Sequence, residues 1–392
     1  MINTTYYQDL TKMNTFGMKV KARCFMEYDS VADLVDIEFE ELARPVLHIG
    51  GGSNLLFTDD FKGTILHSKI NFIEILDGDS RHCEEVSPLR HCEERSDVAI
   101  SSPVLVSVGA GVVFDDFCAW AAKEGLWGVE NLSYIPGEVG ASAVQNIGAY
   151  GVEVKDVIRK VYCYDTVEEE FVSFGVEECG YGYRDSIFKN PEVKGRYIVT
   201  HVVFALSRTP QPKLDYGHLR DAVMASSARH CEEGQSPDVA IFTPSLIRKV
   251  IIKIRKEKLP EPSVMGSAGS FFKNPVISAE HFSRIEAAAK AELGADYNVP
   301  HYVLETSIRH CEEQSDVAIC HMVKVPAAWL IEQCGWKGRR SGGAAVYDKQ
   351  PLVIVNYTGD AYPEEIVGLE RRIIASVKAK FDIELHPEVE HV

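Results

Sequence analysis

The sequence predicts an α+β protein built from two or three domains. The chain has 392 residues, enough for more than one domain with a sizeable buried core. The segment PVLHIGGGSNLLF at 45–57 is typical of a strand, a tight loop and a second strand. The segment 103–123 is typical of a strand followed by a helix, and Phe117, Trp120 and Ala121 at helical spacing predict a core face on that helix.

Composition and charge limit the possible partners. Hydrophobic residues make up 45% of the chain and charged residues 25%, the balance of a soluble globular protein. The net charge of −17 repels nucleic acid and anionic membranes, so we expect neither as a partner, and an anionic substrate would need a local basic pocket. The N-terminus lacks a secretory signal and no apolar stretch is long enough to cross a bilayer, so we expect a cytoplasmic protein.

The tetrapeptide His-Cys-Glu-Glu recurs along the chain, beginning at His82, His91, His230 and His310. The intervals are irregular, which excludes a solenoid, whose units must stack at a fixed period. Structural zinc sites usually need four well-placed ligands, whereas adjacent His and Cys side chains diverge. We therefore interpret the repeats as in-frame insertions in surface loops, expect no metal, and expect the ten cysteines to be mostly free thiols.

Two glycine-rich segments favour a bound ligand. Glycines let a backbone approach a ligand closely, and successive N–H groups can form a nest for a pyrophosphate. The first segment, 50–54, lacks GxGxxG and is not followed by a strong helix, so it is not the Rossmann arrangement. The second, IPGEVGASAVQNIGAYG, places Gln145 and Asn146 among small residues, which suits a planar ligand. Taken alone, the first could be a plain turn and the second an irregular packed loop.

Three later residues bring reactive groups. Arg184 in YGYRDSIFKN can hold a carboxylate, or it can pair with Asp185. Ser270 in GSAGSFFKNP follows a small-residue loop that could equally be a turn entering a strand. Glu388 in ELHPEVEHV stands near the C-terminus, where an exposed carboxylate is the simplest explanation.

Taken together, these motifs resemble the UDP-N-acetylenolpyruvoylglucosamine reductases. The matching words occur in family order over nearly the whole chain outside the repeats; they are NTFG, GGGSNLLF, IPGEVGASAVQNIGAYGVE, YGYRDSIFK, KLP, GSAGSFFKNPV, WLIEQCGWKG, GGAAV and HPEVE. The resemblance implies an FAD-binding domain of the vanillyl-alcohol-oxidase (PCMH-like) type followed by a smaller α+β substrate domain. It implies non-covalent FAD, NADPH as hydride donor and a UDP-sugar substrate, reduced at its enolpyruvyl group to UDP-N-acetylmuramate for peptidoglycan. We expect a monomer.

The resemblance also assigns roles to residues. Arg184 would neutralise the developing enolate, Ser270 would donate a proton to the adjacent carbon, and Glu388 could share a proton with the enolate oxygen. The cofactor-binding residues it implies are Gly50, Gly51, Gly52, Ser53, Asn54, Pro136, Gly137, Gly140, Ala141, Gln145, Asn146 and Gly151. The substrate-binding residues it implies are Tyr183, Tyr216, Lys258, Asn274, Tyr302 and Gln350.

The expected domain layout follows from the same match. Residues 1–258 form the FAD-binding region, with subdomains of about 1–78 and 79–258 and insertions near 81–101 and 228–241. Residues 259–382 form the substrate domain with an insertion near 307–319, and 383–392 return to the active site.

Three other functions stay open at this point. A sugar or lactone oxidase of the same fold would reduce oxygen and need no pair of Ser270 and Glu388. A metal or redox sensor would use the His-Cys repeats. An inactive relic, misfolded by the insertions, is the third, although the complete set of reactive residues argues against decay of the site.

Overall fold

The protein forms two compact units that interleave along the chain. The structure is a computed structural model describing residues 1–76, 102–227, 242–304 and 322–392, so the predicted insertions near 81–101, 228–241 and 307–319 lie outside the described residues. The first unit comprises residues 1–8, 22–52 and 61–257, and the second comprises residues 9–21, 53–60 and 258–392.

The first sheet of the first unit has four strands. In spatial order they are β1 (Ile2–Asp9), β2 (Lys21–Tyr28), β5 (Phe61–Ser68) and β3 (Val46–Ile49). Both β2 and β3 run parallel to β5, which is buried over most of its length. Helix α1 (Val31–Val35) lies between β2 and β3 in the chain. Ser30 caps its N-terminus, since the Ser30 hydroxyl accepts a hydrogen bond of 3.1 Å from the Asp33 amide.

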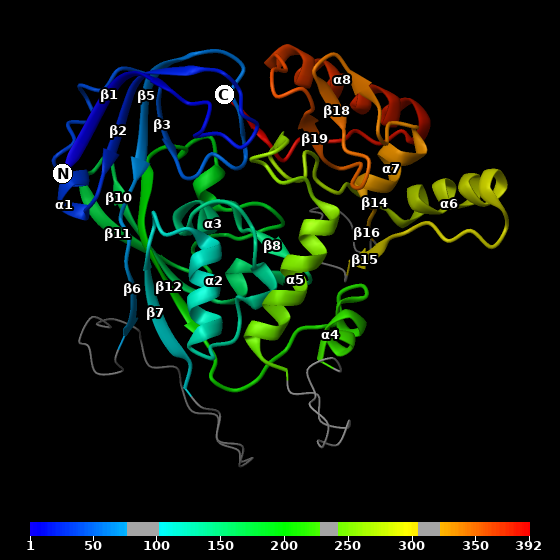
Figure 1. Ribbon diagram of the computed structural model, residues 1–392, viewed down its shortest axis with the longest axis horizontal. Coiled ribbons are helices and arrows are strands. Elements are labelled where there is room, and N and C mark those ends of the chain that lie inside the picture. The colour runs from blue at the N-terminus through cyan, green and yellow to red at the C-terminus, as the bar shows by residue number, and fades with distance from the viewer. Residues whose placement is uncertain (77–101, 228–241, 305–321) are drawn as a thin grey trace, which may run out of the picture. The chain divides into compact units, whose positions relative to one another are not determined.

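The second sheet of this unit carries the larger core. Its antiparallel strands, in spatial order, are β11 (Glu170–Gly175), β10 (Ile158–Asp165), β12 (Tyr197–Leu206), β7 (Val104–Gly109) and β6 (Ile73–Leu76). Helices α2 (Phe114–Lys123) and α3 (Val139–Gln145) supply buried side chains to the core on one face (Figure 1). Phe117, on the predicted core face of α2, packs 4.7 Å from Phe204 between ring centroids.

The two sheets of the first unit share a second cluster of buried side chains. Tyr164 of β10 and Ile198 of β12 pack in this cluster with Tyr28 of β2 and Leu66 of β5. Strand β12 therefore has core on both sides, which explains why nearly all its residues are buried.

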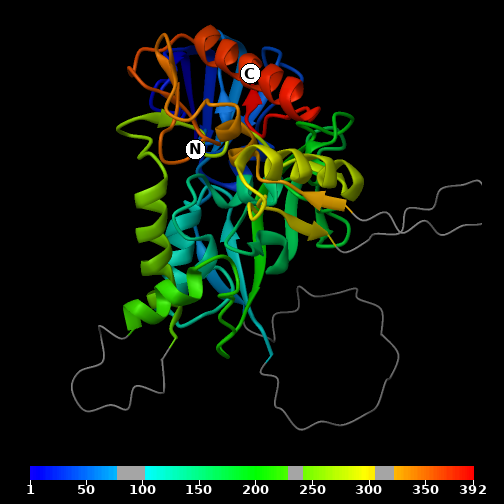
Figure 2. The same cartoon turned by 90° about the vertical axis from the view of Figure 1, so that its right-hand side faces the viewer.

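Helices α4 (Leu219–Ser227) and α5 (Pro244–Lys258) complete the first unit and lie next to each other in both views (Figures 1 and 2). Their apolar faces form one cluster with Trp127. Arg248 of α5 makes a bidentate ion pair with Asp115 of α2, with one N–O distance of 2.9 Å. Burial opposes ionisation of Asp115, but the guanidinium outweighs this and lowers the pKa of the carboxyl.

The second unit is built from short strands and three helices. Its four-stranded sheet is β13 (Gly266–Ser267), β19 (Ile354–Asn356), β18 (Ala344–Val346) and β17 (Arg340–Ser341). Its three-stranded sheet is β14 (Val276–Ser278), β16 (Met322–Lys324) and β15 (Tyr302–Leu304). The described helices are α6 (Ala279–Leu293), α7 (Ala327–Gln333) and α8 (Pro363–Phe381), of which α8 packs on β18 and β19.

Residues 9–21 and 53–60 belong to the second unit, because their backbone forms hydrogen bonds with other segments of that unit. The Ser267 amide donates to the Thr15 carbonyl at 2.9 Å, and the buried Asn356 side chain donates to the Phe16 carbonyl at 3.0 Å. Further along, β4 (Leu55–Leu56) pairs in parallel with β20 (Glu390–His391) near the C-terminus. None of the helices in the described ranges has both the length and the apolar character needed to span a bilayer.

The close contact between Gly266 and the Phe16 backbone leads to a prediction about the free energy of unfolding. A Cβ added at Gly266 would lie 2.1 Å from the Phe16 carbonyl oxygen, so Gly266→Ala must displace either β13 or the turn that contains Phe16. We expect a loss of about 1–3 kcal/mol, the usual cost of overpacking. Thermal unfolding followed by circular dichroism measures the effect.

The matched control is Gly368→Ala in the interior of α8, where the new Cβ would have no described atom within 4 Å. Alanine has the better helix propensity, so this variant should gain about 0.5–1 kcal/mol. Equal shifts in the two variants would contradict the contact at Phe16.

Candidate functional site

The first and second predicted glycine segments meet in the first unit. A Cβ at Gly50 would lie 3.2 Å from the Ala141 Cβ and 3.2 Å from a Glu138 carboxylate oxygen, and one at Gly51 would lie 3.5 Å from the Gly137 Cα. Gly52 has a φ of 60°, in the left-handed region that favours glycine. The two glycine segments therefore pack closely against each other, and their approach to a ligand stays a prediction.

Ser53 and Asn54 follow this turn but belong to the second unit. The Ser53 carbonyl accepts a hydrogen bond of 3.4 Å from the Thr15 hydroxyl. The Asn54 side chain donates to the Glu388 carbonyl at 3.0 Å, and its own carbonyl accepts from the Glu390 amide at 3.0 Å. Asn54 therefore orders the C-terminal segment that carries Glu388.

Arg184 is held against the end of the second glycine segment. Its guanidinium donates to the carbonyls of Gly148 at 2.7 Å and Asn146 at 3.5 Å. The fully buried Asn146 side chain donates to the Gly182 carbonyl at 2.7 Å and to a Glu153 carboxylate oxygen at 2.9 Å. Asn146, predicted as a cofactor contact, thus fixes the turn that carries Arg184.

Lys189 and Arg255 add cations that sequence reasoning missed. The Lys189 ammonium donates to the Gln145 side-chain oxygen at 3.0 Å and to the Arg184 carbonyl at 3.1 Å. Lys189 lies in the same sequence motif as Arg184, and this closeness in sequence was the only indication that Lys189 belongs to the site. Arg255 donates to the Tyr134 carbonyl at 3.0 Å, but in sequence it looks like one more solvated charge of a basic helix.

Burial gives Arg255 its significance. Burial lowers the pKa of Arg255, and the positive charge of Arg184 lowers it further, whereas Tyr150 and Asp115 raise it. A second guanidinium is thus close enough to Arg184 to interact with it electrostatically. Arg184 and Arg255 are therefore candidates for the local basic region that an anionic substrate would need in so acidic a chain.

Exposed aromatic rings lie near this basic region. Tyr183 is 38% exposed, and the centre of its ring lies 5.9 Å from the Arg184 guanidinium carbon. Tyr216 is 44% exposed and packs edge-on against Tyr150, with 6.0 Å between ring centroids. A Cβ at Gly151, whose φ is 79°, would come within 3.5 Å of the Tyr216 Cβ.

The second unit brings the other two predicted reactive residues onto neighbouring segments. The Glu388 amide donates to the Phe271 carbonyl at 2.8 Å, and the Lys273 amide donates to the His386 carbonyl at 2.9 Å. Ser270 directly precedes this pairing. Two motifs separated by more than a hundred residues in sequence therefore share one short backbone ladder, while Arg184 is carried by the first unit.

The remaining predicted substrate residues also lie in the second unit. Lys258 is exposed at the end of α5, and the Asn274 side-chain oxygen accepts from the Ala327 amide at 2.9 Å at the start of α7. Tyr302 of β15 is 45% exposed, with its ring centre 5.7 Å from the Lys324 ammonium. The Gln350 carbonyl accepts from the Val353 amide at 3.0 Å in the turn before β19.

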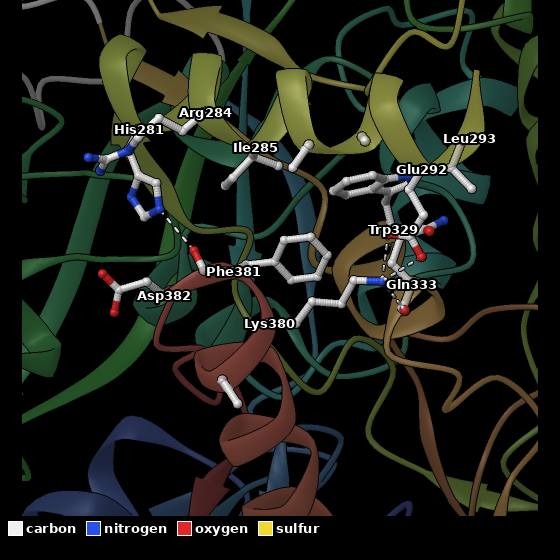
Figure 3. A pocket seen from close by; sticks show the side chains of 13 residues that line it. His281, Arg284, Ile285, Glu292, Leu293, Trp329, Gln333, Lys380, Phe381 and Asp382 are labelled. Atoms are coloured by element: carbon white, nitrogen blue, oxygen red, sulfur yellow. Dashed lines mark hydrogen bonds and ion pairs between the residues drawn. The ribbon is translucent and has the colours of Figure 1, made fainter. Parts of the chain in front are cut away.

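A separate cavity of about 370 Å³ in the second unit is lined by α6, α7 and the end of α8 (Figure 3). Its polar groups bond to one another: His281 Nε2 lies 2.9 Å from the Phe381 carbonyl oxygen, and Lys380 pairs with Glu292 at 3.3 Å. None of the predicted site residues lines this cavity, so we do not assign the substrate to it.

Metal binding finds no support in the part of the chain that the structure describes. There, no group of three or more His, Cys, Asp and Glu side chains could hold a metal ion. The five described cysteines are free thiols, as expected for scattered cysteines. The His-Cys-Glu-Glu repeats themselves lie outside the described residues.

Comparison with known families identifies both halves of the chain. Residues 97–170 match the family described as an FAD binding domain. Residues 261–392 match the C-terminal domain of UDP-N-acetylenolpyruvoylglucosamine reductase. The chain is therefore an FAD-binding oxidoreductase.

Full-length relatives make this class more specific. UDP-N-acetylenolpyruvoylglucosamine reductase from Bacteroides fragilis (strain YCH46) is 46% identical over 384 residues, covering 98% of this chain and 98% of that protein. The reductase of the same name from Porphyromonas gingivalis (strain ATCC 33277) is 40% identical over 388 residues, covering 98% and 97%. The chain belongs to the UDP-N-acetylenolpyruvoylglucosamine reductase family, and the resemblance predicted from its motifs is confirmed.

A solved structure supports the fold. The crystal structure of UDP-N-acetylenolpyruvylglucosamine reductase from Thermus caldophilus aligns with a TM-score of 0.57 at 21% identity, covering 100% of this chain and 98% of that one. Together with the FAD-binding domain match, this confirms the predicted α+β fold with an FAD-binding domain of the vanillyl-alcohol-oxidase type.

Asn54 allows a test of how the C-terminal segment is held. Asn54→Ala removes the amide that donates to the Glu388 carbonyl, a bond of about 1 kcal/mol net. We expect amide hydrogen exchange across 386–392 to accelerate roughly fivefold, because local opening becomes easier by that amount. Exchange followed by mass spectrometry measures it. Asn298→Ala, at an exposed position of the same unit, should leave the segment unchanged. Equal protection in the two variants would mean that the backbone pairing alone holds it.

Proposed function

We propose that the protein reduces the enolpyruvyl group of UDP-N-acetylenolpyruvoylglucosamine with NADPH, through bound FAD, to give UDP-N-acetylmuramate for peptidoglycan synthesis. Membership of the reductase family supports this reaction. The observation that carries it in the structure is the backbone pairing that sets Ser270 beside the segment of Glu388. An oxidase that reduces oxygen would have no use for that pair.

The residues of the first unit fit FAD. A side chain at Gly50 would be crowded by Ala141 and Glu138, and the left-handed backbone of Gly52 favours glycine, so this turn exposes backbone N–H groups and suits the cofactor's diphosphate. When bound, FAD accepts a hydride from NADPH and delivers it to the substrate. Gln145, fixed by Lys189, would present its amide to the flavin ring. Residues proposed with them as cofactor contacts are Ser53, Asn54, Pro136, Gly140, Ala141, Asn146 and Gly151.

Three side chains would act on the reacting carbons and the adjacent carboxylate. Hydride addition to the enolpyruvyl double bond pushes negative charge toward that carboxylate, and Arg184 would stabilise it through charge-assisted hydrogen bonds. Ser270 would donate the proton that completes the reduction, which a weak acid can do because the enolate is a strong base. Glu388 would share a proton with the enolate oxygen and so limit the charge that Arg184 must balance.

The nucleotide part of the substrate would bind through the exposed aromatic and polar side chains. Lys258 would face the diphosphate, and the other proposed contacts are Tyr183, Tyr216, Asn274, Tyr302 and Gln350. Within this proposal, the first unit holds FAD and the second supplies most of the substrate contacts. We further propose a cytoplasmic monomer without nucleic-acid or membrane partners, consistent with the net charge of −17.

The direct test is the visible absorption spectrum of the purified protein under anaerobic conditions. The flavin band should bleach on addition of NADPH and return on addition of the enolpyruvyl UDP-sugar. A colourless protein, or a reduced flavin that ignores the UDP-sugar and is reoxidised only by oxygen, would refute the proposal.

Ser270→Ala separates the two halves of the reaction. Bleaching by NADPH should keep its rate, because Ser270 acts only on the substrate. Recovery of the band with the UDP-sugar should slow by roughly 10²–10⁴-fold, the usual loss when a positioned proton donor is removed. Stopped-flow absorption measures both rates.

The control for this variant is Ser283→Ala, since Ser283 lies on the exposed face of α6 and its hydroxyl bonds only within that helix among the described contacts. It should change neither rate. If Ser270→Ala turned over as fast as this control, the assignment of the proton donor would be wrong.

A further inference from the structure

His67 of β5 lies buried between two carboxylates. Its side chain is only 7% exposed, Nδ1 lies 3.1 Å from Glu27 Oε1, and Nε2 lies 2.9 Å from Glu138 Oε1. A neutral imidazole has one N–H and can donate to only one acceptor, whereas an ionised carboxylate can only accept. Both contacts are satisfied only when His67 carries two ring protons and a positive charge.

The surrounding charges favour this protonated state. Burial is the largest influence and lowers the pKa of His67, but the hydrogen bonds and charges of Glu138 and Glu27 outweigh it, so the pKa is raised. The Lys69 ammonium lies 3.4 Å from Glu27 Oε1, and its positive charge lowers the pKa of His67 by a smaller amount. The negative charges of the two glutamates are then balanced by the positive charges of His67 and Lys69. Loss of the His67 proton would leave this cluster with one net negative charge.

A second, partly buried histidine nearby does not share this role. Burial, followed by the charge of His67, lowers the pKa of His48 to about 4. His48 is therefore neutral near pH 7 and contacts the Tyr28 hydroxyl at 2.7 Å. Burial raises the pKa of Tyr28, so that hydroxyl stays neutral as well. His67 is thus the titrating group of this cluster.

The unbalanced charge would appear at the glycine turn. The second carboxylate oxygen of Glu138 lies 3.2 Å from the Cβ position of Gly50, and its Oε1 lies 4.0 Å from that of Gly51. Glu138 is only 12% exposed, so water screens it weakly. An unpaired carboxylate here would repel any diphosphate bound by the backbone of the turn.

We propose that His67 is a positioning residue for the cofactor: its proton neutralises Glu138 and thereby allows the Gly50–Gly52 turn to accept the diphosphate of FAD. The inference rests on the proposed function, since it takes FAD as the ligand of this turn. It also makes cofactor affinity depend on pH. Since the pKa of His67 is raised, His67 keeps its proton to a higher pH than a free histidine does, and FAD affinity falls as the pH rises through the raised pKa.

The experiment measures the FAD dissociation constant of the full chain by equilibrium dialysis between pH 6 and 9. The unaltered protein should bind FAD on the order of tenfold more weakly at the alkaline end, the effect of one partly buried unit charge near the ligand. His67→Gln should bind weakly at every pH in this range, because it leaves Glu138 unpaired. Circular dichroism at each pH checks that both proteins stay folded.

The decisive variant adds Glu138→Gln to His67→Gln. Removing the carboxylate that needs neutralising should restore FAD affinity to within a few-fold of the unaltered protein and abolish its pH dependence. A purely structural role for His67 predicts the opposite, since the double variant loses two buried partners instead of one. Failure of this rescue in a folded double variant would overturn the inference.

The outcomes also separate this inference from the proposed function. Tight FAD binding with no pH dependence would refute the role of His67 while leaving the reductase intact. Absence of FAD binding at any pH would refute both. Glu27→Gln, measured over the same pH range, adds a control. The loss of FAD affinity should occur at a lower pH in this variant, because His67 loses one of the two carboxylates that stabilise its protonated form.

Discussion

Close packing around glycines is the constraint on which the candidate site depends. The Gly50–Gly52 turn meets the segment from Gly137, and Gly140 meets Ala110, where an added Cβ would come within 2.9 Å of the Ala110 Cβ. Glycine costs conformational entropy in the folded chain, and the surrounding sheets must offset this cost. The large cores on both sides of β12 provide that support.

Charge is the second constraint. An acidic chain of net charge −17 must handle an anionic cofactor and an anionic substrate. The cations proposed for this role are wholly or partly buried: Arg184 and Arg255 for the substrate and His67 for the cofactor. Because these cations are shielded from water, each influences a ligand more than the many exposed charges of the surface do.

Local motifs were sufficient to predict the fold class and the family, whereas the contact between the two glycine segments was not predicted and appears only in the structure. Each of those inferences rests on residues that are close in sequence or on the order of short words. The roles of Lys189, Arg255 and His67 could not be predicted in this way, because each depends on partners from distant segments. Asn54 shows the same limit: its motif suggested a cofactor contact, but its side chain binds the backbone of residue 388, which no local pattern reveals.

The interleaving of the two units bears on how the chain is made. Residues 9–21 and 53–60 are translated early, yet they belong to one unit with residues 258–392, which are translated much later. Strand β4 therefore can pair with β20 only after residues 390–391 have been made. A cut at residue 258 would therefore leave residues 9–21 and 53–60 on a different piece from residues 258–392, with which they form one unit.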